Sequence, residues 1–325
     1  MHPFRYAEPE SVAEACRFLK RQGTSAMPIA GGTDLLSEIK DGVAKPESVL
    51  NLKRLPSLAH IREQDGALRI GGMTTLSQLQ VYPVLRRNFR IIEEALSTLA
   101  TPQIRAVGTV AGNLCQRPRC LYYRHPLFLC AKKGGTTCFA LDGDSRYHAI
   151  LQNDLCPMVH PSDLAPAFIA LEAQVLLAGP EEKRLLPLEE FFLLPGQNLS
   201  RETVLKPGEI LVEVRVPKPK AGTRGTYLKF RERGAGDFAL VSAACSGRVL
   251  RGTVAELRLV LGGVAPIPFR ARQAEEMLMG QRPKKEFFAA AAQAVLAAAT
   301  PLSGNRYKIE AARTLMVRAM QAVLK

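Results

Sequence analysis

Five of the seven cysteines in this 325-residue chain lie between Cys115 and Cys156. Four of them follow the spacing C-x9-C-x7-C-x17-C, from Cys120 through Cys130 and Cys138 to Cys156. Thiolates are soft ligands that favour iron–sulfur clusters or zinc, and thiols clustered in a large chain more often bind metal or do redox chemistry than form a disulfide framework. The spacing differs from the C-x2-C-x2-C run of ferredoxins. By itself it leaves a cluster, a zinc site and a metal-free segment open.

Two glycine-containing loops could bind a phosphate. Ala30-Gly31-Gly32-Thr33-Asp34 follows a strand-like run, and Gly108-Thr109-Val110-Ala111-Gly112-Asn113 follows it by about eighty residues. Glycine lets the backbone approach a ligand closely, and neighbouring N–H groups can converge on an anion. Neither loop is a G-x-G-x-x-G turn or a P-loop, and either one alone could be a plain tight turn. Together they suggest a dinucleotide between two subdomains, and FAD fits such neutral backbone donors.

The elements that must position these residues can be predicted from the hydrophobic pattern. Ser11 and Glu14 have the spacing of a capping box in front of a helix. From about residue 182 the pattern changes to strands followed by helices, which is typical of an α+β domain. We expect strands at 26–29, 48–52, 67–70, 210–216, 225–231, 238–247 and 257–263, a turn-rich passage at 107–114, and helices at 88–99, 286–299 and 308–324.

Composition narrows the class of protein. The formal charge is +14, from 44 basic and 30 acidic residues, and 47% of the residues are hydrophobic. The basic residues are scattered, Trp is absent, and there is no aromatic RNA-binding motif or zinc-finger spacing, so we expect a basic or subunit-docking surface and no nucleic acid. No apolar run is long enough to span a membrane, and the N-terminus lacks a signal-peptide core.

Four ordered motifs give the chain a family resemblance. PIAGGTDLL, IGGMTTLSQL, QIRAVGTVAGNLCQ and HPSDLAPAFIALEA resemble the FAD-binding medium subunit of the molybdenum hydroxylases, the xanthine dehydrogenase family. The resemblance continues through YLKFRERGAGDFALVSAA and LVLGGVAPIPFRA, so it covers nearly the whole chain. It implies an α+β protein with FAD-binding subdomains at 1–55 and 56–180, the second with an insertion at about 115–160, and a C-terminal α+β domain at 181–325.

The resemblance also implies which residues bind FAD. The pyrophosphate would lie on the first loop, and Asp163 would accept ribose hydroxyls near the adenosine. Lys229 would stabilise negative charge on a reduced isoalloxazine ring, although it could also be an exposed strand lysine. The implied FAD residues are Ile29, Ala30, Gly31, Gly32, Thr33, Asp34, Leu35, Thr109, Gly112, Asn113, Asp163 and Lys229.

The cysteine-rich insertion resembles those of 4-hydroxybenzoyl-CoA reductase and of certain periplasmic aldehyde oxidoreductases, where it binds a [4Fe–4S] cluster. The aldehyde oxidoreductase type is more similar, through QRPRCLYY, YHAILQNDLCPMVHPSDLAPA and ARTL. The implied cluster ligands are Cys120, Cys130, Cys138 and Cys156, with zinc as the chemical rival. Cys115 is expected to pack on the flavin side, and His125, His148 and His160 are alternative ligands that we place in turns or on the surface instead.

The resemblance implies an electron-transfer subunit of a heterotrimeric molybdenum hydroxylase. Electrons would arrive from a small [2Fe–2S] subunit, after chemistry on a large molybdopterin subunit, and leave to an external acceptor. No residue of this chain would contact the organic substrate, so no catalytic residue is assigned. One rival is a stand-alone FAD-dependent oxidase or dehydrogenase. The other is a nucleic-acid-binding metal protein, and that rival would leave the glycine loops unexplained. Without its own targeting signal, the chain would reach the periplasm with a partner subunit or stay in the cytoplasm.

Overall fold

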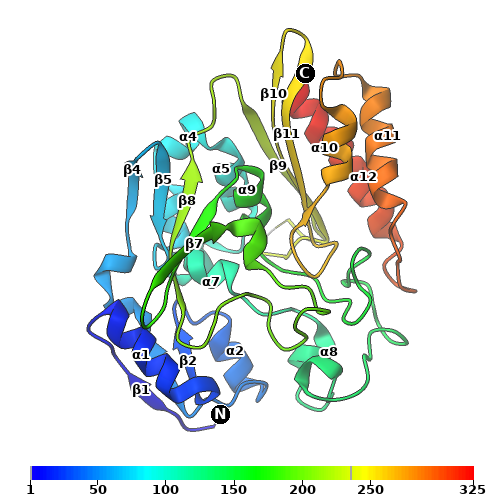
Figure 1. Ribbon diagram of the computed structural model, residues 1–325. Helices are drawn as coiled ribbons and strands as arrows, with labels where there is room; N and C mark the ends of the chain where they lie inside the picture. The colour runs from blue at the N-terminus through cyan, green and yellow to red at the C-terminus, as the bar shows by residue number, and fades with distance from the viewer. Residues whose placement is uncertain (1, 235) are drawn as a thin grey trace.

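The strands of the computed structural model, which describes residues 2–234 and 236–325, form three separate sheets (Figure 1). The first sheet is parallel in the order β1-β3-β2 and consists of β1 (Arg5–Ala7), β2 (Ala26–Ile29) and β3 (Ser48–Asn51). Helix α1 (Val12–Gln22) connects β1 to β2, and α2 (Leu35–Lys40) connects β2 to β3. The predicted cap of α1 is present, because Ser11 Oγ accepts the N–H of Glu14 at 3.2 Å.

The second sheet is antiparallel and extends past a predicted domain boundary. Its order is β4-β5-β8-β6-β7, with β4 (Ile61–Gln64), β5 (Ala67–Gly71), β6 (Gln174–Ala178), β7 (Lys183–Pro187) and β8 (Ile210–Pro217). The boundary that we predicted after residue 180 falls between β6 and β7, which are hydrogen-bonded neighbours. The middle unit therefore continues to Pro217, since its central strand β8 comes from beyond that boundary.

Several short helices lie between β5 and β6 in the chain. They are α3 (Leu76–Gln80), α4 (Val84–Asn88), α5 (Arg90–Thr98), α6 (Pro102–Val107), α7 (Val110–Leu114) and α9 (Leu164–Ala170). The capping box at α3 is complete, with Thr75 and Gln78 each bonded to the other's backbone N–H. Residues 107–114, predicted as a turn-rich passage, contain α7 because the Thr109 hydroxyl caps it by accepting the N–H of Gly112.

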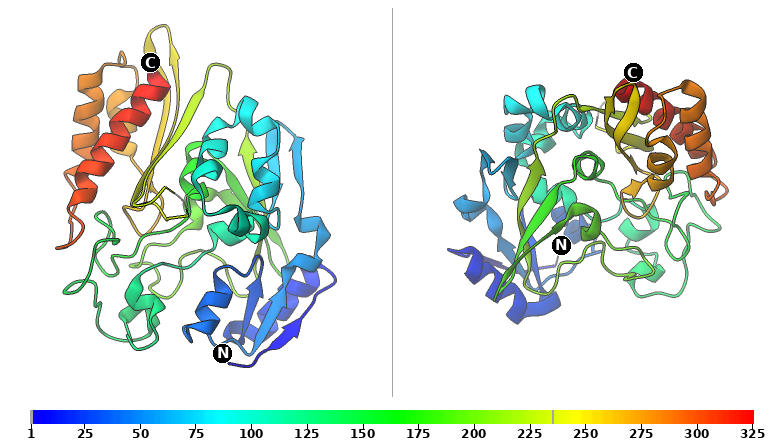
Figure 2. Two further views of the ribbon diagram at one scale, coloured as in Figure 1. Left: turned by 180° about the vertical axis from the view of Figure 1, so that it is seen from behind. Right: turned by 45° about the horizontal axis from the view of Figure 1, so that its top comes forward.

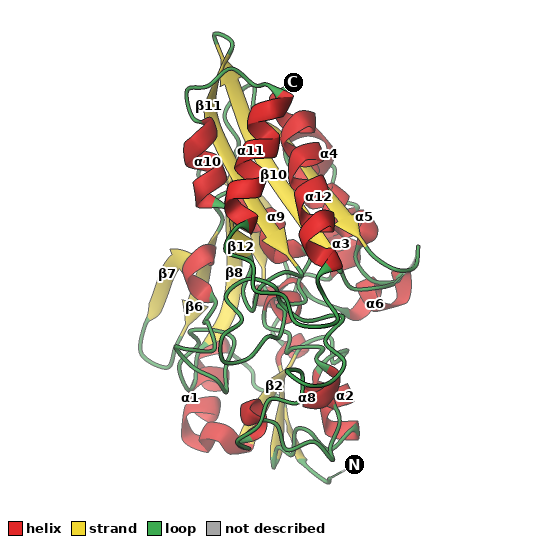
Figure 3. Ribbon diagram, turned by 90° about the vertical axis from the view of Figure 1, so that its right-hand side faces the viewer, coloured by secondary structure: helices red, strands yellow, loops and turns green. Residues whose placement is uncertain are grey.

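The third sheet has helices on one face and the middle unit on the other. Its order is β12-β11-β10-β9, with β9 (Arg224–Phe230), β10 (Val241–Leu250), β11 (Thr253–Gly262) and β12 (Phe269–Arg270). Figure 3 shows α10 (Arg272–Leu278), α11 (Lys285–Leu296) and α12 (Tyr307–Leu324) against one face. Helices α5 and α9 contact the same sheet from the middle unit. Both predicted C-terminal helices are confirmed, whereas α10 was not predicted.

The insertion between α7 and α9 has little regular structure. Its only α-helix in the described residues is α8 (Leu121–Arg124), followed by a 3-10 turn at Ala131–Lys133. Figure 2 shows its loops between the N-terminal unit and the C-terminal helices. In the described part of the chain, no helix is long and apolar enough to cross a membrane.

Candidate functional site

The two glycine loops lie directly against each other. A Cβ atom on Gly31 would stand 2.3 Å from the carbonyl oxygen of Val107 and 2.9 Å from Cα of Gly108. Gly32 has a φ of +79°, a conformation that L side chains rarely adopt. Both glycines are therefore required by the backbone geometry, and the turn is more than a generic tight turn.

The IGGMTTLSQL segment holds the second loop in place. The N–H of Leu76 donates to the oxygen of Gly108 at 2.9 Å, and the N–H of Ala111 donates to the oxygen of Gly72 at 2.9 Å. A Cβ on Gly72 would lie 2.4 Å from the oxygen of Leu211, so β5 and β8 also meet tightly here. Three of the sequence motifs thus converge at one place in the fold.

A cleft of about 550 Å³ opens where these loops meet. This volume lies within the range of ligand and cofactor sites. Ile29 packs into the N-terminal core instead, and Lys229 lies behind Asp163. The predicted FAD residues that line the cleft are Ala30, Gly31, Gly32, Thr33, Asp34, Leu35, Thr109, Gly112, Asn113 and Asp163.

Backbone donors are available on the first loop. Across the described residues, no protein acceptor takes a hydrogen bond from the N–H of Gly31, Gly32 or Thr33. Successive free N–H groups on a glycine turn make a concave anion site that suits a diphosphate. The side chain of Asn113 is held by Ser162, whose hydroxyl donates to Asn113 Oδ1 at 2.6 Å. These residues fit the diphosphate of FAD.

Asp163 and Lys229 form one buried unit. Lys229 Nζ donates to Asp163 Oδ2 at 2.7 Å and to the oxygen of Thr98 at 3.1 Å. The hydroxyl of Tyr227 donates to Asp163 Oδ1 at 2.5 Å, and burial together with this carboxylate raises the pKa of Tyr227 well above its usual value. The separate roles predicted for Asp163 and Lys229 need correction. Because the two side chains are in contact, both would lie at the same part of the FAD site.

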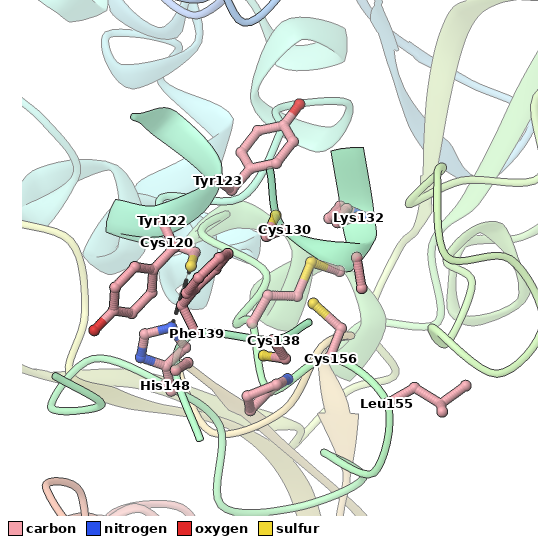
Figure 4. A pocket seen from close by; sticks show the side chains of 14 residues that line it. Cys120, Tyr122, Tyr123, Cys130, Lys132, Cys138, Phe139, His148, Leu155 and Cys156 are labelled. Carbon is pink, nitrogen blue, oxygen red and sulfur yellow. Dashed lines mark hydrogen bonds between the residues drawn. The ribbon is translucent and has the colours of Figure 1, made fainter. Parts of the chain in front are cut away.

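The four predicted cluster ligands line one small internal cavity (Figure 4). Cys120, Cys130, Cys138 and Cys156 come from separate parts of the insertion, yet all face the same space of about 20 Å³. Cys115 is not among them; it lines the cleft beside the glycine loops, as predicted. The insertion thus brings together the four thiols that the spacing singled out.

Backbone N–H groups surround these thiols. Burial raises the pKa of Cys120, Cys138 and Cys156, in the last case to about 11. The N–H groups of Tyr122 and Tyr123 act in the opposite direction on Cys120, as those of Ala140 and Leu141 do on Cys138 and that of Met158 does on Cys156. Donors placed two or three residues after a cysteine stabilise its thiolate, and such hydrogen bonds tune iron–sulfur clusters.

Glycines let the insertion fold tightly around the cavity. A Cβ on Gly135 would lie 2.0 Å from the oxygen of Leu129, and one on Gly143 would lie 2.0 Å from the hydroxyl oxygen of Tyr122. Gly134 has a φ of +90°. The backbone of the insertion therefore requires glycine at these three positions.

Of the three histidines considered as alternative ligands, only His148 faces the thiols. Its Nε2 lies 3.2 Å from Cys120 Sγ, and burial lowers its pKa to about 4. His160 is buried against the ring of Phe192, and His125 is exposed at the end of α8. Within the described residues, no three His, Cys, Asp or Glu side chains lie close enough to hold a single metal ion.

Several side chains near both sites were not predicted. Glu38, Arg117 and Glu202 line the cleft, and Tyr123 lines the cysteine cavity. Their contacts join segments that are distant in sequence, so no local motif could have revealed them.

Comparison with known proteins assigns the family. Residues 2–219 match the family described as FAD binding domain in molybdopterin dehydrogenase, and residues 226–323 match the CO dehydrogenase flavoprotein C-terminal domain. The chain belongs to the FAD-binding medium subunits of the molybdenum hydroxylases. The two matches meet in the linker after β8, where the second sheet ends.

This medium subunit has similar relatives along its whole length. It is 34% identical over 330 residues to the aldehyde oxidoreductase FAD-binding subunit PaoB of Escherichia coli K12, covering 98% of both chains. It is 31% identical to the carbon monoxide dehydrogenase medium chain of Hydrogenophaga pseudoflava, covering 98% and 96%. A structure of carbon monoxide dehydrogenase from that organism matches with a TM-score of 0.79 and 31% identity, covering 99% and 98%. The predicted fold and the assignment to an oxidoreductase are confirmed.

Proposed function

We propose that this medium subunit carries both FAD and a [4Fe–4S] cluster and transfers electrons within a heterotrimeric aldehyde oxidoreductase. Electrons would arrive from a small [2Fe–2S] subunit, after aldehyde oxidation on a large molybdopterin subunit, and pass to an external acceptor. The aldehyde class rests on the similarity to PaoB over 98% of both chains. The convergence of four spaced thiols on one cavity carries the cluster assignment.

The number and chemistry of the donors support a cluster. Four thiolates suffice for a [4Fe–4S] cube, whereas zinc, the chemical rival, would need all of its ligands within bonding distance of one point. In a cubane each thiolate binds a different iron, so the four sulfurs surround a wider space. The cavity of about 20 Å³ must expand to accept it.

The residues of the cleft have defined tasks towards FAD. When bound, FAD would supply a flavin that accepts electrons one at a time and releases them singly or in pairs. The free N–H groups of Gly31, Gly32 and Thr33 would hold its diphosphate. The buried pair of Lys229 and Asp163 would keep a fixed cation and hydrogen-bond acceptor beside the cleft.

Cofactor analysis of the anaerobically purified chain tests this proposal. We expect about one FAD and about four irons with four acid-labile sulfides per chain, and no stoichiometric zinc. Zinc in place of iron, or iron absent after anaerobic reconstitution, would contradict the cluster. Failure to bind added FAD would contradict the assignment of the cleft.

The aldehyde assignment is tested on the complex purified with its partner subunits. An aldehyde should bleach the flavin of this chain under anaerobic conditions, whereas xanthine and carbon monoxide should leave it oxidised. If xanthine or carbon monoxide bleached the flavin and the aldehyde did not, the aldehyde assignment would be wrong. Transport to the periplasm with a partner stays a prediction, which cell fractionation with and without the partner's leader segment would test.

A further inference from the structure

A polar wall separates the FAD cleft from the cysteine cavity. Asp34, Glu38 and Glu202 line the cleft, whereas Tyr123 and Lys132 belong to the lining of the cavity that Figure 4 draws. The wall is built from ion pairs whose partners are distant in the chain, from 70 positions apart for Lys132 and Glu202 to 90 positions apart for Asp34 and Arg124. It is therefore a tertiary contact, formed only when the insertion has folded.

Asp34, at the end of the first glycine loop, is surrounded by the insertion. Its Oδ1 lies 2.7 Å from Arg124 Nη2 and 3.0 Å from Arg119 Nη1. Its Oδ2 accepts the backbone N–H of Arg117 at 2.7 Å. The loop that would hold the diphosphate is thus attached to the insertion through its carboxylate.

Glu38, one turn further along α2, is also held by the insertion. The hydroxyl of Tyr123 donates to Glu38 Oε1 at 2.8 Å, and Arg124 Nη1 lies 3.6 Å from the same oxygen. The guanidinium groups of Arg117 and Arg124 lie over the Tyr123 ring at 5.3 and 5.6 Å. The side chain of Glu38 is only 4% exposed, so this carboxylate depends on these partners.

Glu202 completes the wall on the side of the cavity. Its carboxylate lies 2.5 Å from Lys132 Nζ and 3.2 Å from Arg117 Nη1, and Lys132 also donates to the oxygen of Leu199. The side chains of Glu202 and Lys132 are 5% and 2% exposed. Lys132 also lines the cysteine cavity together with Cys156, so its charge lies next to the thiols.

The charges of the wall are divided by origin. All of its cations come from the insertion, and all of its carboxylates come from outside it. If the insertion unfolds, three carboxylates remain beside a site for a diphosphate, and like charges at short range repel strongly where water is limited. The cations are Arg117, Arg119, Arg124 and Lys132, and the carboxylates are Asp34, Glu38 and Glu202.

We infer that the folded insertion sets the affinity for FAD by neutralising Asp34, Glu38 and Glu202, so that filling the cysteine site strengthens FAD binding. The second part rests on the proposed function, because a cluster would hold the four thiols and thereby the insertion in place. By linkage, bound FAD would stabilise the loaded cysteine site by the same factor.

The test is titration of FAD into the full-length, flavin-depleted chain, followed by flavin fluorescence. Arg124→Gln should weaken FAD binding about tenfold, within the usual range of coupling between sites. Adding Asp34→Asn to that variant should restore most of the affinity, because the unpaired carboxylate is then gone. Arg146→Gln is the matched control, since Arg146 is an exposed insertion arginine paired with Asp144 away from the wall.

The outcomes separate this inference from the proposed function. A double variant that binds FAD no better than Arg124→Gln would overturn charge neutralisation, since a purely structural role gives no rescue. If the chain holds iron and Cys138→Ser abolishes it without weakening FAD binding, the coupling is wrong while the cluster stands. If the chain binds no iron, the cluster fails, and the Arg124 and Asp34 variants still decide whether the insertion neutralises the cleft.

Discussion

The FAD cleft and the cysteine insertion are neighbours that are stabilised in different ways. The cleft is formed by loops at the ends of strands and capped helices, whose backbone groups bond one another. The insertion has one four-residue α-helix among its described residues and is held by side-chain ion pairs, glycine turns and its thiol cluster. The cleft can therefore form from local structure and core packing, whereas the insertion depends on its charged partners and, in our proposal, on the cluster that its thiols would hold.

Removing one of the four thiols should have the largest effect of these changes, on the iron content of the chain. Cys138→Ser deletes one of the four thiols at the cavity, and we expect it to abolish nearly all cluster-bound iron. Cys16→Ser is the control, because Cys16 is a core residue whose Sγ donates to the oxygen of Ala178. Iron analysis of both variants checks this. Equal iron loss in both would mean that the effect is general misfolding.

Breaking the buried ion pair of Lys229 and Asp163 should have the second-largest effect. Lys229→Gln leaves Asp163 without its cation at a site where the side chains are 1% and 5% exposed. We expect a loss of about 3 kcal/mol in unfolding free energy, the usual cost of an uncompensated buried charge. Denaturant unfolding measures it. In the double variant with Asp163→Asn, part of that loss should return, and strict additivity would contradict the pairing.

Acid should affect the cleft side through His160. Burial lowers its pKa to about 4 from an ordinary value of 6.5. Between these pH values the unfolded chain binds a proton that the folded chain does not, so the free energy of unfolding falls as the pH falls. The loss of unfolding free energy from this one histidine reaches about 3 kcal/mol near pH 4 and is absent above pH 6.5. His160→Gln should flatten this acid limb, whereas the exposed His2→Gln should leave its slope unchanged.

Glycine replacements should separate the two regions. Gly31→Ala forces a methyl group against the oxygen of Val107, so we expect a loss of about 1–3 kcal/mol and weaker FAD binding with iron retained. Gly135→Ala places a methyl group against the oxygen of Leu129 and should reduce iron content instead. Gly196→Ala, with no atom within 4 Å, is the neutral control. Identical cofactor losses in Gly31→Ala and Gly135→Ala would mean that the regions fold as one.

The sequence predicted those features that have local signals. The helix cap at Ser11, the glycine loops, the C-terminal helices and the four thiols were all recognisable because each depends on residues close together in the chain. The structure then brought both loops to one cleft and all four thiols to one cavity. Their convergence was expected from the family resemblance, since spacing alone had left several alternatives open.

The features that the sequence did not predict depend on long-range contacts. The extent of the second sheet was missed because β8 pairs with β5 and β6, which are separated from it in the chain by long segments whose sequence does not indicate the pairing. The contact between Asp163 and Lys229 and the pairing of Glu202 with Lys132 join distant segments, and neither has a spacing rule. Charged residues usually lie on the surface, so a single sequence gives no reason to expect these to be buried.

A reductive titration with dithionite, followed by absorption and EPR spectroscopy, tests the central claim most directly. Two cofactors in one chain should consume about three electron equivalents, about two at the flavin and one at the cluster. The reduced chain should then show the EPR signal of a reduced [4Fe–4S] cluster. Uptake of about two equivalents, with only flavin bleaching and no such signal, would contradict the account and leave a flavoprotein whose four gathered thiols hold no redox centre.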